Sequence, residues 1–149
     1  MNGKIVTGIL AFFIAMYASP AMAQQPGKVA RIGYVSATGI PDTNFDELRL
    51  GLRDLGHVEG KNITFEYRGA EGKPELIPGF VAELLQLKVD LLFCPNLPAI
   101  HAAKEATKTV PIVIVSNVDP VELGLVDSFA RPGGNITGMT LQSLELSGK

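Results

Sequence analysis

The feature of this sequence that most constrains its fold is a regular alternation between short apolar runs and longer segments with apolar residues at helical spacing. Apolar runs occur at 29–35, 91–94 and 112–115, of which the first and the last are rich in β-branched residues, and residues 63–67 alternate between apolar and polar positions. These patterns are typical of strands buried in a sheet. Strands joined by helical crossovers run parallel. The alternation therefore predicts an α/β fold with a doubly wound parallel sheet.

The segments between the predicted strands carry helix signals. Asn44 followed by Glu47 has the form of a capping box that would start the first helix. Pro74 suits the first turn of the second helix, and Asn96 with Pro98 would open the third. The residues expected to face the sheet are Phe45, Leu48, Leu52 and Leu55 in the first helix, and Leu76, Phe80, Leu84 and Leu87 in the second.

A fourth helix is expected after the run at 112–115. Asp119, Pro120 and Glu122 repeat the chemistry of a helix start, with an acidic N-cap, proline at the first position and glutamate at the third. A short last strand is expected at 136–140. The inward residues of this fourth helix would be Val121, Leu125 and Phe129.

The N-terminus has the pattern of a secretory signal peptide. Lys4 precedes an apolar run at 5–17, and Ala21-Met22-Ala23 supplies small residues before a signal-peptidase cut. About 13 helical residues cover roughly 20 Å, which is short of the ~30 Å hydrocarbon core that a permanent anchor must span. We therefore expect cleavage after Ala23 and a location in the periplasm. The expected organisation is a signal peptide at 1–23, a flexible leader at 24–28 and a folded lobe at 29–140.

Composition and motifs exclude several function classes. The net charge is −2 and the basic residues are scattered singly, so we expect no nucleic-acid partner. Two separated His and the single Cys94, an expected core residue, indicate no metal site, and no phosphate loop or dinucleotide fingerprint indicates a cofactor. Ser36, His101 and Asp119 have the residue types of a catalytic triad, but no G-x-S-x-G turn surrounds the serine. We therefore expect that this protein is not an enzyme.

Three loops follow predicted strands at the carboxyl edge of the sheet, where doubly wound folds bind ligands. They are residues 36–44, 95–98 and 116–119, and they offer polar side chains and free backbone N–H groups at helix starts. Such groups suit an anionic or zwitterionic solute such as a carboxylate. The same residues could serve only as helix caps, and their convergence on one edge is what favours a site. The candidate ligand-binding residues are Ser36, Thr38, Asn96, Pro98, Ser116, Asn117 and Asp119.

Five segments carry a resemblance to a known family: RIGYVSATG, LRDLGHVEGKNITFEYRGAEG, LLQLKVDLLF, PAIHAAKEATKTVPIVIV and DPVELGLVDSFARPGGNITG. They resemble the first half of the periplasmic substrate-binding proteins of one ABC-transporter family, whose members include proteins proposed to serve tryptophan or tyrosine uptake. The resemblance covers the chain from Val29 to its end. It departs at position 96, where Asn stands in place of the more usual Gly or Thr, and at position 57, where His stands in place of the usual aromatic residue.

The resemblance implies a type I periplasmic-binding-protein fold, in which two Rossmann-like lobes close on a small solute. This chain would be the N-terminal lobe, residues 141–149 would begin the crossover to a missing second lobe, and the chain would be a truncated form. The implied function is solute capture, with an amino acid as a candidate solute and with ABC permease and ATPase subunits in the membrane as partners. A periplasmic sensor or interaction module without a transport role is the alternative.

Overall fold

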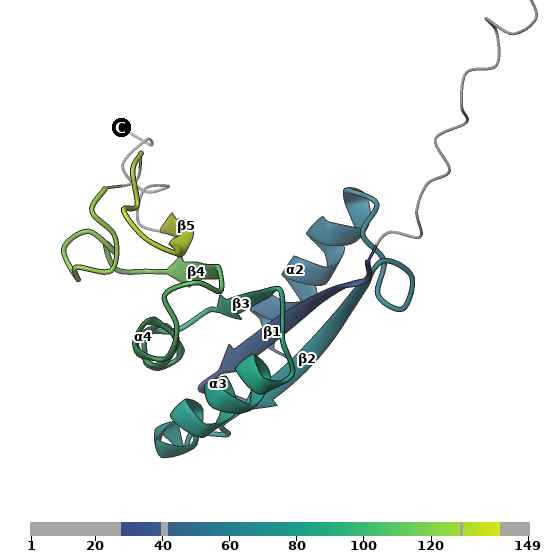
Figure 1. The fold of residues 1–149 in the computed structure, drawn as a ribbon, viewed down its shortest axis with the longest axis horizontal. Helices are drawn as coiled ribbons and strands as arrows, with labels where there is room; N and C mark the ends of the chain where they lie inside the picture. The colour runs from purple at the N-terminus through teal and green to yellow at the C-terminus, as the bar shows by residue number, and fades with distance from the viewer. Residues whose placement is uncertain (1–27, 40–41, 129, 141–149) are drawn as a thin grey trace, which may run out of the picture.

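The computed structural model describes residues 28–39, 42–128 and 130–140, and its sheet confirms the predicted α/β class. The strands are β1 (Ala30–Ser36), β2 (Ile63–Gly69), β3 (Leu91–Cys94), β4 (Ile112–Ser116) and β5 (Ile136–Thr140) (Figure 1). All of their pairings are parallel, in the order β2-β1-β3-β4-β5. The chain winds one way from β1 to β2 and then crosses back over β1 to β3. The sheet is therefore doubly wound, as predicted.

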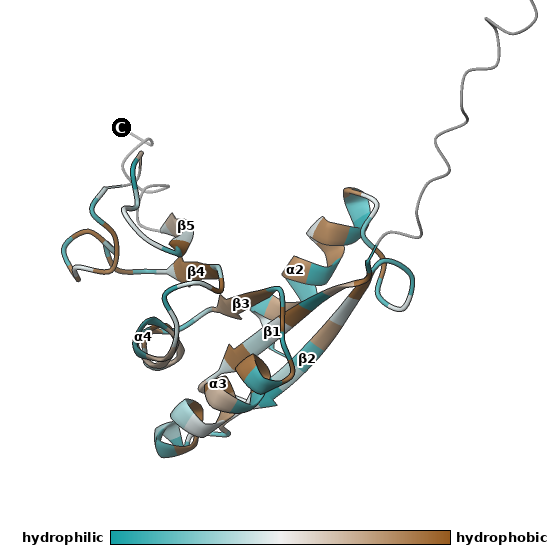
Figure 2. Cartoon of the chain, viewed as in Figure 1, coloured by the Kyte–Doolittle hydropathy of each residue, from teal (hydrophilic) through white to brown (hydrophobic). Residues whose placement is uncertain are grey.

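Helices cover both faces of this sheet (Figure 1). One face carries α2 (Thr43–Asp54), and the other carries α3 (Ile77–Gln86) and α4 (Leu97–Ala106), which pack against each other. Apolar stretches follow the strands in Figure 2. The core accordingly forms two clusters. The cluster on the α2 face is largely aromatic and consists of the buried residues Ile32, Tyr34, Phe45, Ile63, Phe65 and Phe93.

The first helix begins before the predicted capping box. Asp42, and not Asn44, is the N-cap, because its backbone is extended and its Oδ1 accepts a hydrogen bond from the N–H of Phe45 at 3.0 Å. Phe45 is buried as expected, whereas Leu55 lies past the helix end and is 77% exposed. The predicted inward face was therefore correct at its start and wrong at its last position.

The second helix has a different buried face from the one predicted. Residues Pro74–Leu76 form a 3-10 turn, η1, which has three residues per turn and changes the phase of the α-helix that follows. The buried residues of α3 are Ile77, Val81 and Leu84, whereas Leu76 and Leu87 are exposed. Of the four residues that were expected to face the sheet, only Leu84 is fully buried, and Phe80 is partly buried.

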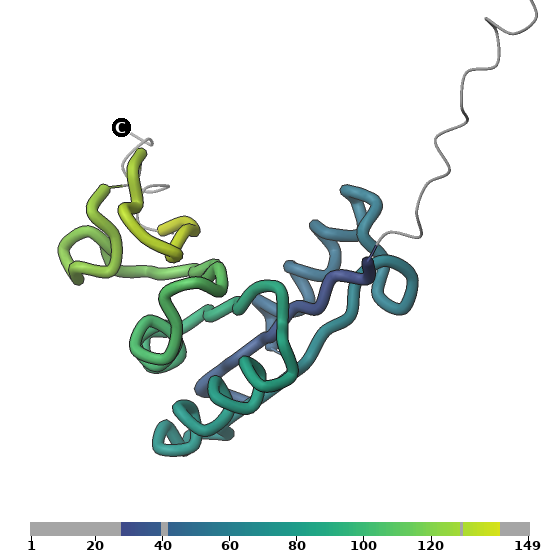
Figure 3. The backbone as a smooth tube through the Cα atoms, in the orientation of Figure 1, coloured from purple at the N-terminus to yellow at the C-terminus, as the bar shows by residue number. Residues whose placement is uncertain are grey.

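Among the described residues between β4 and β5, 117–128 and 130–135, no helix forms in place of the predicted fourth helix. The N–H of Leu125 donates to the carbonyl of Pro120 at 2.9 Å, which closes a turn at 120–124, and Gly124 then leaves helical geometry with a φ of 62°. Figure 3 traces the segment as an open loop. Asp119 starts a helical turn as expected, but the left-handed glycine ends it. Of the residues predicted to face inward, Leu125 is buried, Val121 is partly buried and Phe129 lies outside the described residues.

The predicted signal peptide, leader residues 24–27 and the segment 141–149 lie outside the described residues. Across the three described ranges, none of the helices is both long enough and apolar enough to span a membrane.

Gly138 in β5 should be intolerant of any side chain. A Cβ at this position would lie 2.0 Å from the carbonyl oxygen of Ile114, and the φ of 153° is rare for other residues. We expect Gly138→Ala to lower the free energy of unfolding by about 2 kcal/mol or more in urea denaturation.

Gly51 is the matched control, because it lies in α2 and a Cβ there would meet nothing within 4 Å. Gly51→Ala should raise the free energy of unfolding by roughly 0.5–1 kcal/mol, since alanine favours helix. Equal effects at the two positions would contradict the β4–β5 pairing.

Candidate functional site

The three loops selected from the sequence lie along one edge of the sheet. Strands β1, β3 and β4 are neighbours and run parallel, so their carboxyl ends, at Ser36, Cys94 and Ser116, share that edge. The winding of the chain reverses between β1 and β3. The loops after these two strands therefore flank the switch point at which open α/β sheets bind ligands.

A hydrogen bond joins the β1 and β3 loops across this switch point. Nδ2 of Asn96 donates to Oγ of Ser36 at 3.4 Å, linking residues that are 60 positions apart in the sequence. Oδ1 of the same amide accepts from the N–H of Ala99 at 3.3 Å and caps α4. Asn96 therefore caps a helix and also connects two loops. Pro98 lies in the first turn of α4 and is exposed.

Asp42 belongs to the hydrogen-bond network at this edge, and the sequence analysis did not single it out. Its Oδ1 accepts from Oη of Tyr34 at 2.5 Å, and its Oδ2 accepts from Oγ of Ser36 at 2.9 Å. Oγ1 of Thr38 lies 2.9 Å from Ser36 Oγ and 3.4 Å from Asp42 Oδ2. An Asp three residues before the buried Phe45 was the available signal, because that spacing is typical of an N-cap.

Burial decides the protonation of the two titratable core groups beside this network. Burial, followed by the hydrogen bond to Asp42, raises the pKa of Tyr34, so its phenol stays protonated and donates. Burial raises the pKa of the Cys94 thiol to about 12, which agrees with the prediction of a core residue. Neither group supplies a nucleophile to the edge.

The predicted residues of the first two loops differ in accessibility. Ser36 is completely buried, with a relative exposure of 0%. Thr38 is exposed and Asn96 is half-buried, so their side chains are within reach of a solute. Ser36 instead lies behind them and bonds to Asp42, Thr38 and Asn96.

The β4 loop lies at the same edge but has its own hydrogen bonds. Oγ of Ser116, which is buried, donates to the carbonyl of Val118 at 2.8 Å and accepts from the N–H of Val118 at 3.1 Å. Asn117 is exposed, and Oδ1 of Asp119 accepts from the N–H of Val121 at 2.8 Å. Among the described residues, no hydrogen bond connects this loop to Ser36 or the rest of the Asp42 network.

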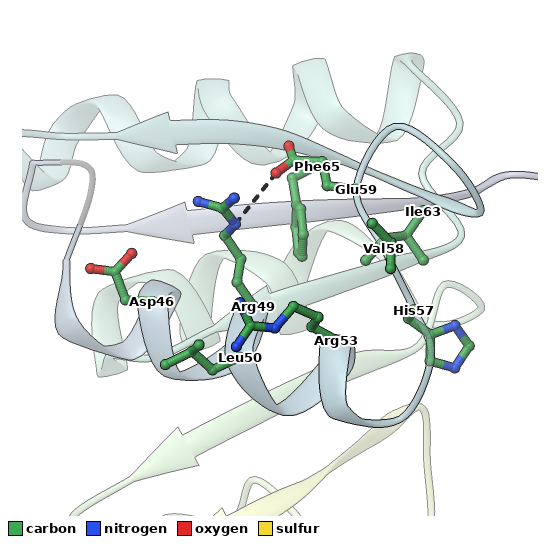
Figure 4. Close-up of a pocket in the computed structure, with 9 residues that line it drawn as sticks. All are labelled: Asp46, Arg49, Leu50, Arg53, His57, Val58, Glu59, Ile63 and Phe65. Atoms are coloured by element: carbon green, nitrogen blue, oxygen red, sulfur yellow. Dashed lines mark ion pairs between the residues drawn. The ribbon is translucent and has the colours of Figure 1, made fainter.

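A hollow of about 490 Å³ lies elsewhere, between α2 and the edge strand β2 (Figure 4). Arg49 and Glu59 form an ion pair in it, with Nε and Oε2 3.4 Å apart, and Phe65 forms part of its wall. None of the residues predicted from the sequence to bind a ligand lines this hollow. The hollow and the switch-point edge are separate features.

The described residues offer no arrangement for catalysis by the triad considered above. Ser36 donates its proton to Asp42, His101 is exposed, and Asp119 accepts from a backbone N–H. Nor does the described part of the chain contain a group of three or more His, Cys, Asp or Glu side chains placed to hold a metal ion.

The comparisons with known proteins agree on one family. A family model described as ABC transporter substrate binding protein matches residues 28–146. The tyrosine-binding protein of Clostridioides difficile strain R20291 is 36% identical over 87 residues, which are 58% of this chain and 25% of that protein. The chain thus spans about a quarter of the length of this curated relative.

Solved structures share the fold. A conserved domain protein from Vibrio cholerae has a TM-score of 0.71 at 32% identity, and the match covers 80% of this chain and 43% of the Vibrio cholerae chain. The ligand-free, open structure of a substrate-binding protein with adhesive properties from Clostridium difficile has a TM-score of 0.69 at 30% identity. The match covers 79% of this chain and 42% of that one. An ABC domain from Streptococcus pneumoniae in complex with L-Trp has a TM-score of 0.68 at 25% identity, and the match covers 74% of this chain and 38% of that one.

Substitutions at Asn96 should separate its capping role from its bond to Ser36. Asn96→Ala removes both, and we expect a loss of about 1–2 kcal/mol in the free energy of unfolding. Asn96→Asp keeps an acceptor for the cap but has no N–H for Ser36, so it should recover most of the stability. Urea denaturation measures both, and an equal loss in the two variants would contradict the assignment of Asn96 as the N-cap.

Proposed function

Because the chain belongs to the ABC transporter substrate-binding protein family, we propose that it is the N-terminal, solute-binding lobe of an exported protein that captures an amino acid for an ABC uptake transporter. This family consists of substrate-binding proteins and not of enzymes. The observation that carries the proposal is the hydrogen bond from Asn96 to Ser36, which joins two loops at the switch point.

An aromatic L-amino acid is the solute that the relatives favour. One relative is a tyrosine-binding protein, and one structural neighbour is in complex with L-Trp. The edge carries both kinds of group that a zwitterion needs, since the Asn96 amide can donate and the Thr38 hydroxyl can accept. We infer that this edge forms one wall of a binding cleft.

The proposed division of roles follows accessibility. We propose that the ligand contacts Thr38, Asn96, Pro98, Asn117 and Asp119, each of which is at least partly exposed. Ser36 and Ser116 are buried, so we assign them to holding the loops in place. Binding by such an edge needs no cofactor.

Membrane ABC permease and ATPase subunits are the proposed partners, because substrate-binding proteins of this family deliver solutes to them. We propose export to the periplasm through the signal peptide at 1–23.

Titration calorimetry of the purified chain with L-tyrosine and L-tryptophan tests the proposed function. We expect saturable binding of at least one of them and none of L-arginine or L-glutamate. Asn117→Ala should weaken this binding, whereas Gln86→Ala should not, since Gln86 is an exposed amide at the end of α3, at the opposite edge of the sheet. Absence of binding to both aromatic amino acids would refute amino-acid capture by this lobe.

Export is tested by fractionation of bacteria that express the full chain. The periplasmic protein should begin at Gln24 when its N-terminus is sequenced, because Ala21 and Ala23 are the small residues before the cut. Replacing Ala23 with a bulky residue, Ala23→Phe, should leave the uncleaved form in the membrane fraction. A wild-type chain that stays uncleaved in the cytoplasm would contradict export.

A further inference from the structure

The hydroxyl protons at the end of β1 are all directed inward. Asp42 accepts from the phenol of Tyr34 and the N–H of Phe45 at Oδ1, and from Ser36 at Oδ2. Thr38 Oγ1 lies 3.4 Å from the same Oδ2. A carboxylate has about four lone-pair positions, of which three accept from Tyr34, Phe45 and Ser36. The fourth faces the Thr38 hydroxyl, so Asp42 is not open to a direct contact with a ligand.

The direction of the bond between Ser36 and Thr38 follows from this. A serine hydroxyl has one proton, and Ser36 donates it to Asp42. Ser36 Oγ also accepts from the N–H of Thr38 at 3.2 Å and from Nδ2 of Asn96 at 3.4 Å. The proton in the 2.9 Å contact between the two hydroxyls must then belong to Thr38, and Oδ2 of Asp42, 3.4 Å away, shares it. Thr38 is exposed, so the lone pairs of its oxygen are presented outward.

We propose that Asp42 is a positioning residue that, through Ser36, holds the Thr38 hydroxyl as an acceptor for the ammonium group of the bound amino acid. The inference rests on the proposed function, and it names a specificity role for a residue that does not itself contact the ligand. The hydrogen bonds among Thr38, Ser36 and Asp42 also polarise the two hydroxyls, which makes the Thr38 oxygen a better acceptor for an ammonium group.

The β3 side of the same edge has the opposite polarity. Oδ1 of Asn96 is used by the N–H of Ala99, so the amide faces the switch point with its NH₂ group. One N–H donates to Ser36, and the second meets no acceptor among the described residues. Asn96 is thus placed to donate to a carboxylate. The two sides of the switch point together set the orientation of a zwitterion, with its ammonium at β1 and its carboxylate at β3.

Asp42→Asn is the decisive variant, because Asn caps helices as well as Asp does but offers an N–H in place of one acceptor oxygen. Binding is measured by titration calorimetry with two matched pairs of probes: L-tryptophan with indole-3-propionate, and L-tyrosine with 3-(4-hydroxyphenyl)propanoate. The second member of each pair lacks only the ammonium group. We expect the variant to bind the amino acid about tenfold or more weakly than the wild type does, with little change for the deaminated probe.

Thr38→Val supplies a second test that leaves the helix cap intact. It removes the proposed acceptor and should show the same selective loss for the amino acids, and Thr38→Ser should restore their binding. An equal weakening of both members of a pair, or no weakening in either variant, would overturn the role of Asp42. Failure of the wild type to bind either amino acid would instead defeat the proposed function, and this inference with it.

Discussion

Strand β1 is paired on both sides, and the arrangement of the lobe depends on this double pairing. Its residues match β2 from Ala30 to Ser36 and match β3 from Ile32 to Tyr34. Since both neighbours are parallel to β1, the chain reaches each through a crossover, and the two crossovers place α2 and α3 on opposite faces. The carboxyl ends of β1 and β3 then meet, with the starts of α2 and α4 beside them.

The same residues serve the fold and the site at this meeting point. Asp42 caps α2, accepts from Tyr34 in the aromatic cluster and accepts from Ser36 behind the edge. Tyr34 in turn stacks on Phe93 of β3, with ring centroids 5.3 Å apart. Because helix capping, core packing and loop position share these contacts, the polar edge is held by the buried aromatic cluster. Such support keeps the geometry of exposed site residues well defined.

Volume alone does not identify the candidate site of this lobe. The hollow between α2 and β2 has a volume of about 490 Å³, but none of the residues predicted to bind a ligand lines it, and Arg49 and Glu59 in its wall form an ion pair. The switch-point edge brings together polar groups from strands that the sheet orders side by side. The matched part of this chain accounts for 38–43% of each of the three solved structures.

The sequence by itself determined the strands, most of the helices and the edge on which the loops lie, because periodicity, β-branched runs and N-caps act within a few residues. It did not distinguish Asp42 from Asn44 as a cap, since both residue types suit that role and the choice depends on where Tyr34 and Ser36 lie. It also predicted a helix after β4 that Gly124 ends after one turn. Only the tertiary structure decided that Asn96 reaches Ser36 across 60 residues, because such a partner is set by the order of strands in the sheet.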